Sequence, residues 1–134
     1  MQVRTRMRHP AISCPPATKL VEVARMMEEH EVGSVVVVDD NDDVEGLVTD
    51  RDLVLAIARE MSLSTPVEEI AATPVLVVGE HEDVYDAAAK MTAARCRRLP
   101  VVSVTGNLVG MIALEDVLPD FAHRTESVLT RMRP

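Results

Sequence analysis

The chain has 134 residues and a formal net charge of −8, with 47% hydrophobic but only 1% aromatic residues. This length lies within the roughly 100–200 residues of one domain, so we expect a single module. The acidic balance argues against general binding to nucleic acid or an anionic membrane, because both need clustered lysine and arginine. No run approaches the ~18 apolar residues of a membrane span, and no signal peptide is visible. We therefore expect a cytoplasmic protein.

The sequence contains two copies of one motif. The stretch Gly46–Asp52 returns as Gly110–Asp116 at a constant offset of 64 residues (110 − 46 = 64). A solenoid needs three or more copies, so this pattern indicates a duplicated unit. We assign residues 1–64 to the first repeat and 65–134 to the second. Each half alone would bury too little surface for stability, so we expect both to share one core.

The predicted elements of the first copy are easily read. An extended segment at Ala11–Cys14 precedes a helix over Leu20–Met27, whose apolar residues recur at i, i+3, i+4 and i+7. The valine run Ser34–Val38 is typical of a buried strand, and Val44–Thr49 returns beside it as a hairpin. A helix follows over Asp50–Met61. Each repeat should therefore be strand, helix, strand, strand, helix, which is an α/β fold.

The second copy has two further predicted features, a helical turn at its start and a helix at its end. Thr65–Glu68 has the composition of a helical turn with a capping box, in which the threonine caps. A helix over Val84–Met91 and a hairpin of Leu99–Val104 with Leu108–Ala113 follow at the expected offset. A last helix is predicted over Pro119–Met132, because its proline interrupts the preceding helix. We expect it to dock on its own core, with a second subunit as the alternative.

Candidate binding residues begin with a threonine and two aspartates. Thr49 and Asp52 have the spacing of a capping box. A carboxylate at a helix start can also bind the two hydroxyls of a ribose, and both interpretations stay open. In the second copy Asp116 is kept, while Ala113 replaces the threonine.

Two arginines form the second candidate. Arg97 and Arg98 directly precede a predicted buried strand. Guanidinium groups at the start of a strand suit bidentate phosphate binding. The alternative is a solvated basic patch on an acidic protein.

No metal site or catalytic apparatus is expected. The acidic turn Asp39–Asp43 alternates like a calcium loop, but Val44 and Asp50 stand where that loop needs glycine and glutamate, which favours a plain hairpin turn. Glycine-rich phosphate loops are missing from the sequence. Cys14 and Cys96 are expected to be small hydrophobes, with a redox-sensing disulfide as the alternative.

These features together resemble the CBS-domain pair, or Bateman module, over about residues 7–122. The residues that carry the resemblance are Val35–Asp39, Gly46–Leu53, Arg97–Val102 and Gly110–Ile112. The resemblance implies two tandem CBS repeats packed about a pseudo-twofold axis, with two clefts between them. It further implies modules that pair as homodimers, and clefts that bind AMP, ADP, ATP or S-adenosylmethionine. It implies neither catalysis nor a required cofactor, so an adenine nucleotide would be a regulatory ligand.

The resemblance also implies roles for individual residues. Thr49, Asp52 and, in the second copy, Asp116 would hold ribose and phosphate. Arg97 and Arg98 would contact phosphate. The adenine slot would be lined by Ile12, Ser13, Val35, Val77 and Leu99.

We therefore expect a regulatory, ligand-sensing module that binds an adenine nucleotide and acts on a separate effector protein, because the chain carries nothing beyond the module. The alternative is a structural dimerisation module with degenerate, empty clefts. Two features favour that alternative: the alanine at Ala113, and the uncharged pair Gly33 and Ser34 where the second copy has two arginines. For a module with occupied clefts, the resemblance implies asymmetric phosphate binding, by the arginines of one repeat only. A nucleic-acid binder using the N-terminal arginines and Arg95–Arg98 is disfavoured by the net charge.

Overall fold

The computed structural model describes residues 1–117, so the helix expected over Pro119–Met132 lies outside the described residues. In chain order the elements are η1 (Val3–Thr5), β1 (Ser13–Cys14), α1 (Leu20–His30), β2 (Ser34–Val38), β3 (Val44–Thr49), α2 (Asp50–Ala58), η2 (Val67–Glu69), β4 (Val78–Gly79), α3 (Val84–Ala94), β5 (Arg98–Val102), β6 (Leu108–Ala113) and α4 (Leu114–Val117). The strand, helix, strand, strand, helix order predicted for each repeat is confirmed. No helix within the described part of the chain has the length and apolarity to cross a membrane.

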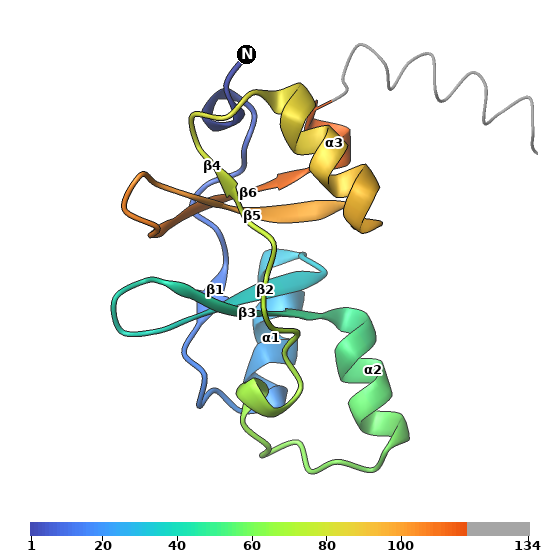
Figure 1. The fold of residues 1–134 in the computed structure, drawn as a ribbon. Helices are drawn as coiled ribbons and strands as arrows, with labels where there is room; N and C mark the ends of the chain where they lie inside the picture. Colours follow the sequence, from blue (N-terminus) through green and yellow to red (C-terminus); the bar gives the residue numbers. More distant parts are fainter. Residues whose placement is uncertain (118–134) are drawn as a thin grey trace, which may run out of the picture.

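The strands form two three-stranded sheets, β1-β2-β3 and β4-β5-β6. In each sheet the first strand runs parallel to the second, and the second pairs antiparallel with the third. The register repeats at the sequence offset, since Ser34 pairs with Thr49 and Arg98 pairs with Ala113. The two sheets face each other, and α3 lies on the outer side of the β4-β5-β6 sheet (Figure 1).

The valine run explains how the sheets can face each other. Val35 and Val37 belong to a core cluster with residues of α1, whereas Val36 and Val38 point to the opposite side of β2, because side chains alternate along a strand. All four are buried. Burial of one valine side chain is worth about 1.5–3 kcal/mol, so β2 stabilises packing on both of its faces.

The 3₁₀ turn that begins each repeat packs into the core of the other repeat. Val3 of η1 is fully buried in the core cluster of the second repeat, with Val78 and Val84. Val67 of η2 is equally buried in the cluster of the first repeat, with Leu20. The one shared core expected from the sequence is therefore wrong: there are two core clusters, and each is completed by a valine from the other repeat.

The helical turn predicted at Thr65–Glu68 exists, but its predicted capping box is wrong. Pro66 is the N-cap of η2, and no side chain caps that helix. The Thr65 hydroxyl instead donates a hydrogen bond of 2.6 Å to the carbonyl of Ser62. Because η2 begins one residue later than predicted, with Pro66 as its N-cap, Thr65 does not occupy the capping position.

The segments that follow η1 and η2 each add a backbone contact to the sheet of the other repeat. Arg8 forms an isolated antiparallel bridge with Met111 of β6, and Ala72 forms one with Leu47 of β3. Both N–H groups of each pair donate to the opposite carbonyl, at 2.8 to 3.1 Å. These contacts bring the segment before β1 against the second sheet, next to the end of β6.

Candidate functional site

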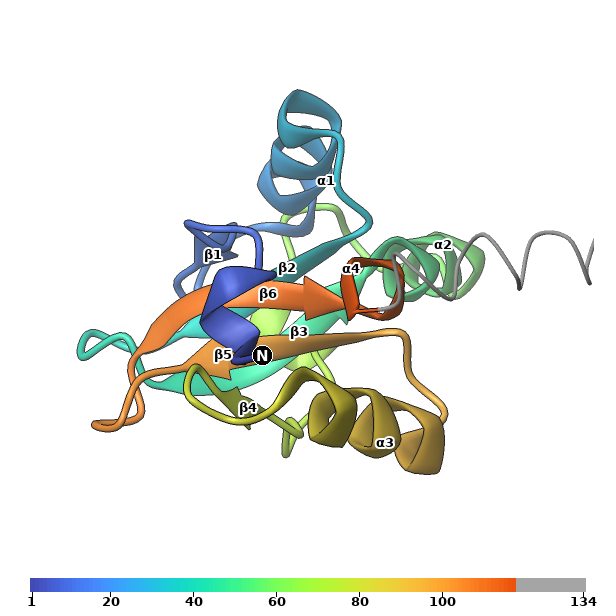
Figure 2. The ribbon, with the colours of Figure 1, turned by 90° about the horizontal axis from the view of Figure 1, so that it is seen from above.

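One edge of the molecule gathers the starts of four elements. β3 and β6 run to this edge, where α2 and α4 begin directly after them (Figure 2). The strand register places the start of β2 beside the end of β3, and the start of β5 beside the end of β6. Helix starts carry unpaired N–H groups, so polar side chains are expected to collect here.

A cavity of about 120 Å³, which we call the first cleft, lies at this edge and is lined by both repeats. The first repeat contributes Arg8, Ile12, Glu31, Gly33 and Ser34 to its lining. The second repeat contributes Arg98, Ala113, Glu115 and Asp116. A molecule in this cleft would therefore contact both repeats at once.

Asp116 is the best-anchored polar side chain of the first cleft. Only 15% of its side chain is exposed, and its Oδ2 accepts a hydrogen bond of 3.1 Å from the N–H of Ala113. Its Oδ1 pairs with the Arg8 guanidinium at 3.4 Å. A carboxylate has about four acceptor positions, so Asp116 can still accept hydrogen bonds from a ligand.

The equivalent carboxylate of the first repeat forms a complete capping box. The Thr49 hydroxyl accepts from the N–H of Asp52 at 3.2 Å, and the Asp52 carboxylate accepts from the N–H of Thr49 at 2.8 Å. The capping interpretation of this pair is confirmed. A ribose contact uses the remaining carboxylate oxygen and stays a prediction.

The two candidate arginines are placed differently. Both side chains are exposed, but only Arg98 lines the first cleft. Its Nη1 is 3.5 Å from the position where a Cβ on Gly33 would stand. The glycine therefore leaves room for a guanidinium that reaches across from β5 to the start of β2.

Three of the predicted site residues, Ile12, Arg98 and Asp116, meet in the first cleft. The other seven do not line it: Thr49, Asp52, Arg97, Ser13, Val35, Val77 and Leu99. Val35 and Leu99 are 0% and 2% exposed, so their side chains are enclosed by the cores. Ser13 and Val77 are half-buried.

Sequence reasoning missed Arg8 and Glu31 in this cleft. Arg8 comes to it through the bridge with Met111, which pairs residues far apart in the sequence. Glu31 ends α1 in the left-handed conformation, with φ 53°. The repeat offset could have suggested it, since Arg95 ends α3 in the same way at φ 55°.

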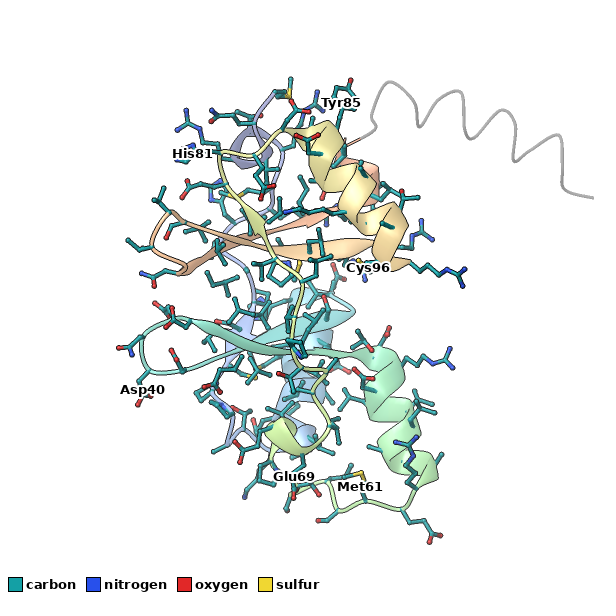
Figure 3. The ribbon with its side chains drawn as sticks, viewed as in Figure 1. Asp40, Met61, Glu69, His81, Tyr85 and Cys96 are labelled. Atoms are coloured by element: carbon teal, nitrogen blue, oxygen red, sulfur yellow. The ribbon has the colours of Figure 1, made fainter. Side chains whose placement is uncertain are left out.

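Both cysteines of the described chain are free thiols. Cys14 is buried in the core cluster of the first repeat. Its burial raises the pKa of the thiol, while a hydrogen bond with Thr18 acts in the opposite direction. Cys96 is half-buried. It packs against the core cluster of the second repeat, just beyond the end of α3 (Figure 3).

A family model described as CBS domain matches residues 2–59 and again residues 67–122. The chain is 35% identical over 113 residues to the uncharacterised protein MK0525 of Methanopyrus kandleri, covering 83% of this chain and 58% of that protein. It is also 35% identical over 103 residues to the CBS domain-containing protein YhcV of Bacillus subtilis, covering 76% and 72% of the two chains. The chain thus spans little more than half the length of the Methanopyrus relative.

Solved structures match over almost the whole chain. The CBS domain protein PAE2072 from Pyrobaculum aerophilum, solved in complex with AMP, has a TM-score of 0.82 and 27% identity over 92% of this chain and 99% of that one. The CBS domain pair of protein MJ0100, solved with 5′-methylthioadenosine and S-adenosyl-L-methionine, has a TM-score of 0.82 and 25% identity, covering 92% and 98%.

Proposed function

The chain belongs to the CBS-domain family, and we propose that it is a regulatory module that binds an adenine nucleotide or S-adenosylmethionine between its two repeats. The observation that supports this most is the first cleft, which joins an anchored carboxylate, Asp116, to an arginine and an apolar residue from both repeats. The AMP complex of PAE2072 and the S-adenosylmethionine complex of MJ0100, similar in fold over most of the chain, add support.

Each part of an adenine nucleotide has a suitable partner in the first cleft. Asp116 can accept hydrogen bonds from ribose hydroxyls, because its carboxylate is held by the backbone at the start of α4. Ile12 and Val32 provide apolar surface for the adenine ring. Arg98 provides a guanidinium for phosphate.

The size of the first cleft limits how deeply a ligand can enter. Its volume of about 120 Å³ is smaller than the roughly 300–1,000 Å³ of ordinary ligand pockets. We therefore propose that only part of the ligand lies inside and that the rest extends into solvent beside the exposed side chains of Arg8 and Arg98. The remaining predicted contacts, Thr49, Asp52 and Arg97, belong in this proposal to a second, symmetry-related cleft.

Regulation would follow from the contact with both repeats. A ligand shifts a conformational equilibrium only as far as it binds one arrangement better than the other. A ligand held by Ile12 on one side and Asp116 on the other favours the arrangement in which both are in reach. We propose that a homodimer of the module passes this preference to a separate effector protein, without catalysis by the module itself.

A second candidate function is a dimerisation scaffold with empty clefts. Ala113 favours it, because the second repeat lacks the hydroxyl that completes the capping box at Thr49. The ion pair between Arg8 and Asp116 favours it as well, since it already occupies one carboxylate oxygen.

Thermal unfolding with AMP, ADP, ATP, S-adenosylmethionine and adenosine distinguishes the two functions. A ligand at a hundredfold excess over its Kd stabilises the folded state by about 2.7 kcal/mol. We expect such a shift with at least one ligand, and a smaller shift in Asp116→Ala. Asp40→Asn, in the hairpin turn on the side away from Cys96 (Figure 3), is the matched control. Flat curves with millimolar concentrations of every ligand contradict the proposal and support the scaffold.

A further inference from the structure

We propose that the two clefts bind ligands of different charge: the second cleft takes the polyphosphate of a nucleoside di- or triphosphate, and the first cleft takes an adenosyl group that carries no polyphosphate. This inference rests on the proposed function and specifies it further. It depends on where the acidic and basic residues of this chain stand relative to its internal symmetry.

The second cleft is defined by the positions 64 residues from those that line the first. The contacts that build the first cleft recur at that offset, since the bridge of Arg8 with Met111 corresponds to that of Ala72 with Leu47. The strand register that places Ser34 beside Thr49 likewise corresponds to that of Arg98 and Ala113. The same backbone framework therefore recurs between the end of α3 and the start of α2, and the second cleft of this proposal lies there.

Apart from Ser34 and Arg98, which are each other's equivalents, the two clefts differ in charge at four pairs of equivalent positions. One pair, Arg8 and Ala72, makes the first cleft more basic, and the other three make the second cleft more basic. Glu31, Gly33 and Glu115 line the first cleft. Their equivalents in the second cleft are Arg95, Arg97 and Arg51. In the first of these pairs the backbone conformation is the same, because Glu31 and Arg95 are both left-handed, at φ 53° and 55°. Two carboxylates and a hydrogen atom are thus replaced by three guanidinium groups.

The first cleft is poorly suited to a polyphosphate. Its lining contains the carboxylates of Glu31, Glu115 and Asp116 against the guanidinium groups of Arg8 and Arg98. Arg8 is already paired with Asp116. A triphosphate would therefore face more negative than positive charge, and like charges at short distance repel. A neutral or positively charged adenosyl ligand meets no such penalty.

The second cleft has the opposite balance. Arg51, Arg95 and Arg97 are exposed, and none makes an ion pair within residues 1–117. The carboxylate at the position equivalent to Asp116 is Asp52, which is held in its capping box. Arginine binds phosphate oxygens in bidentate geometry, so three free guanidinium groups around one adenosine site favour a chain of phosphates.

Calorimetric titration of the full chain with ATP and with 5′-methylthioadenosine tests the inference. Arg51→Glu, Arg95→Glu and Arg97→Gly, made together, place the residues of the first cleft in the second. We expect ATP affinity to fall at least about tenfold, because three charge-assisted contacts are lost, while the affinity for 5′-methylthioadenosine changes little. Arg51→Glu alone repeats the test with minimal risk to folding. ATP binding to the unaltered chain should also weaken with added salt, since the arginines are exposed.

The reverse exchange is the matched gain-of-function variant. Glu31→Arg and Glu115→Arg should give the first cleft a basic lining and raise the ATP stoichiometry from one to two per chain. Unchanged ATP affinity in the first variant set overturns the inference, and so does equal binding of two ATP molecules by the unaltered chain. If the unaltered chain binds neither of these two ligands but does bind AMP or S-adenosylmethionine, the inference fails and the proposed function stands. If it binds none of the four, the proposed function itself fails. If ATP and 5′-methylthioadenosine both bind but the variants change nothing, only the assignment of the clefts fails.

Discussion

Asp52 and Asp116 occupy the same repeat position and differ in their surroundings. Asp52 shares a complete capping box with Thr49. Asp116 makes only half of that arrangement, because Ala113 has no hydroxyl, and its second oxygen contacts Arg8. A capping box is worth roughly 1 kcal/mol to a helix, so the spacing alone explains why an acid stands at Asp52. Capping explains the aspartate at Asp116 less completely, because only one of the two capping hydrogen bonds forms there. A ligand contact is therefore the hypothesis to test at Asp116.

Glu82 is a carboxyl whose pKa is lowered by contacts made in the folded chain. Its Oε2 accepts a hydrogen bond of 2.6 Å from the N–H of Gly79, and Lys90 lies 2.9 Å from its other oxygen. The Gly79 N–H chiefly, with help from Lys90, holds the pKa of this carboxyl below its ordinary value. A carboxyl whose pKa is lower in the folded state stabilises the protein above its unfolded pKa, near 4.3, and this stabilisation is lost as pH falls through the folded pKa.

We predict that Glu82→Gln makes the free energy of unfolding less sensitive to acid. Urea unfolding measured between about pH 6 and pH 3 should show the unaltered protein losing stability more steeply than the variant below about pH 4.3. The effect should be modest, because 37% of the Glu82 side chain is exposed and solvent screens it. Glu45→Gln, at an exposed strand position, is the control. Parallel pH curves for all three proteins would show that the Gly79 contact has no effect.

At the level of elements, the two 3₁₀ turns connect the repeats to each other. Residues near a chain terminus are usually expendable unless they are packed down. Val3 is an exception, since it is fully buried in the second repeat's core cluster, as Val67 is in the first.

We predict that Val3→Ala lowers the free energy of unfolding by about 2 kcal/mol, from the lost transfer energy and the cavity left behind. Val67→Ala should cost a similar amount, because it occupies the equivalent place in the other core cluster. Val104→Ala, whose side chain is 88% exposed, is the control and should change stability little. Denaturant unfolding measures all three. A Val3→Ala variant as stable as the control would mean that η1 does not stabilise the second repeat.

The helices and strands were largely predictable from the sequence, but the segments that each of them packs against were not. The apolar positions Leu20, Val23 and Met27 predict a helix with one buried face, and these three residues are buried in α1. Periodicity reports which face is buried but not what covers it. The exchange of η1 and η2 between the repeats therefore could not be predicted. The capping box at Thr65 was predicted wrongly because η2 has Pro66 rather than Thr65 as its N-cap, and the Thr65 hydroxyl donates to the carbonyl of Ser62.

For the whole molecule, the resemblance to CBS-domain pairs implies a pseudo-twofold arrangement, and the isolated bridges between the repeats within residues 1–117 follow it. Asp43 even pairs with its own equivalent, Asn107, where the two hairpin turns meet. The candidate site was predictable only in part for a related reason. Asp116, Arg98 and Ile12 were found as members of separate motifs, whereas their meeting in one cleft depends on how the sheets face each other. Arg8 enters by a backbone bridge that no local pattern encodes.

The binding of an adenine nucleotide between the repeats is tested most directly by a nuclear magnetic resonance titration of the isotope-labelled chain with AMP. We predict that the amides of Ile12, Ala113 and Asp116 shift if the first cleft is occupied, and those of Thr49 and Asp52 if the second is. A cavity of about 540 Å³ supplies an internal control through Val44, Glu45 and Glu68, which line it and are not equivalent to any residue that lines the first cleft. Shifts confined to these three residues, or no shifts with millimolar AMP, would contradict the account.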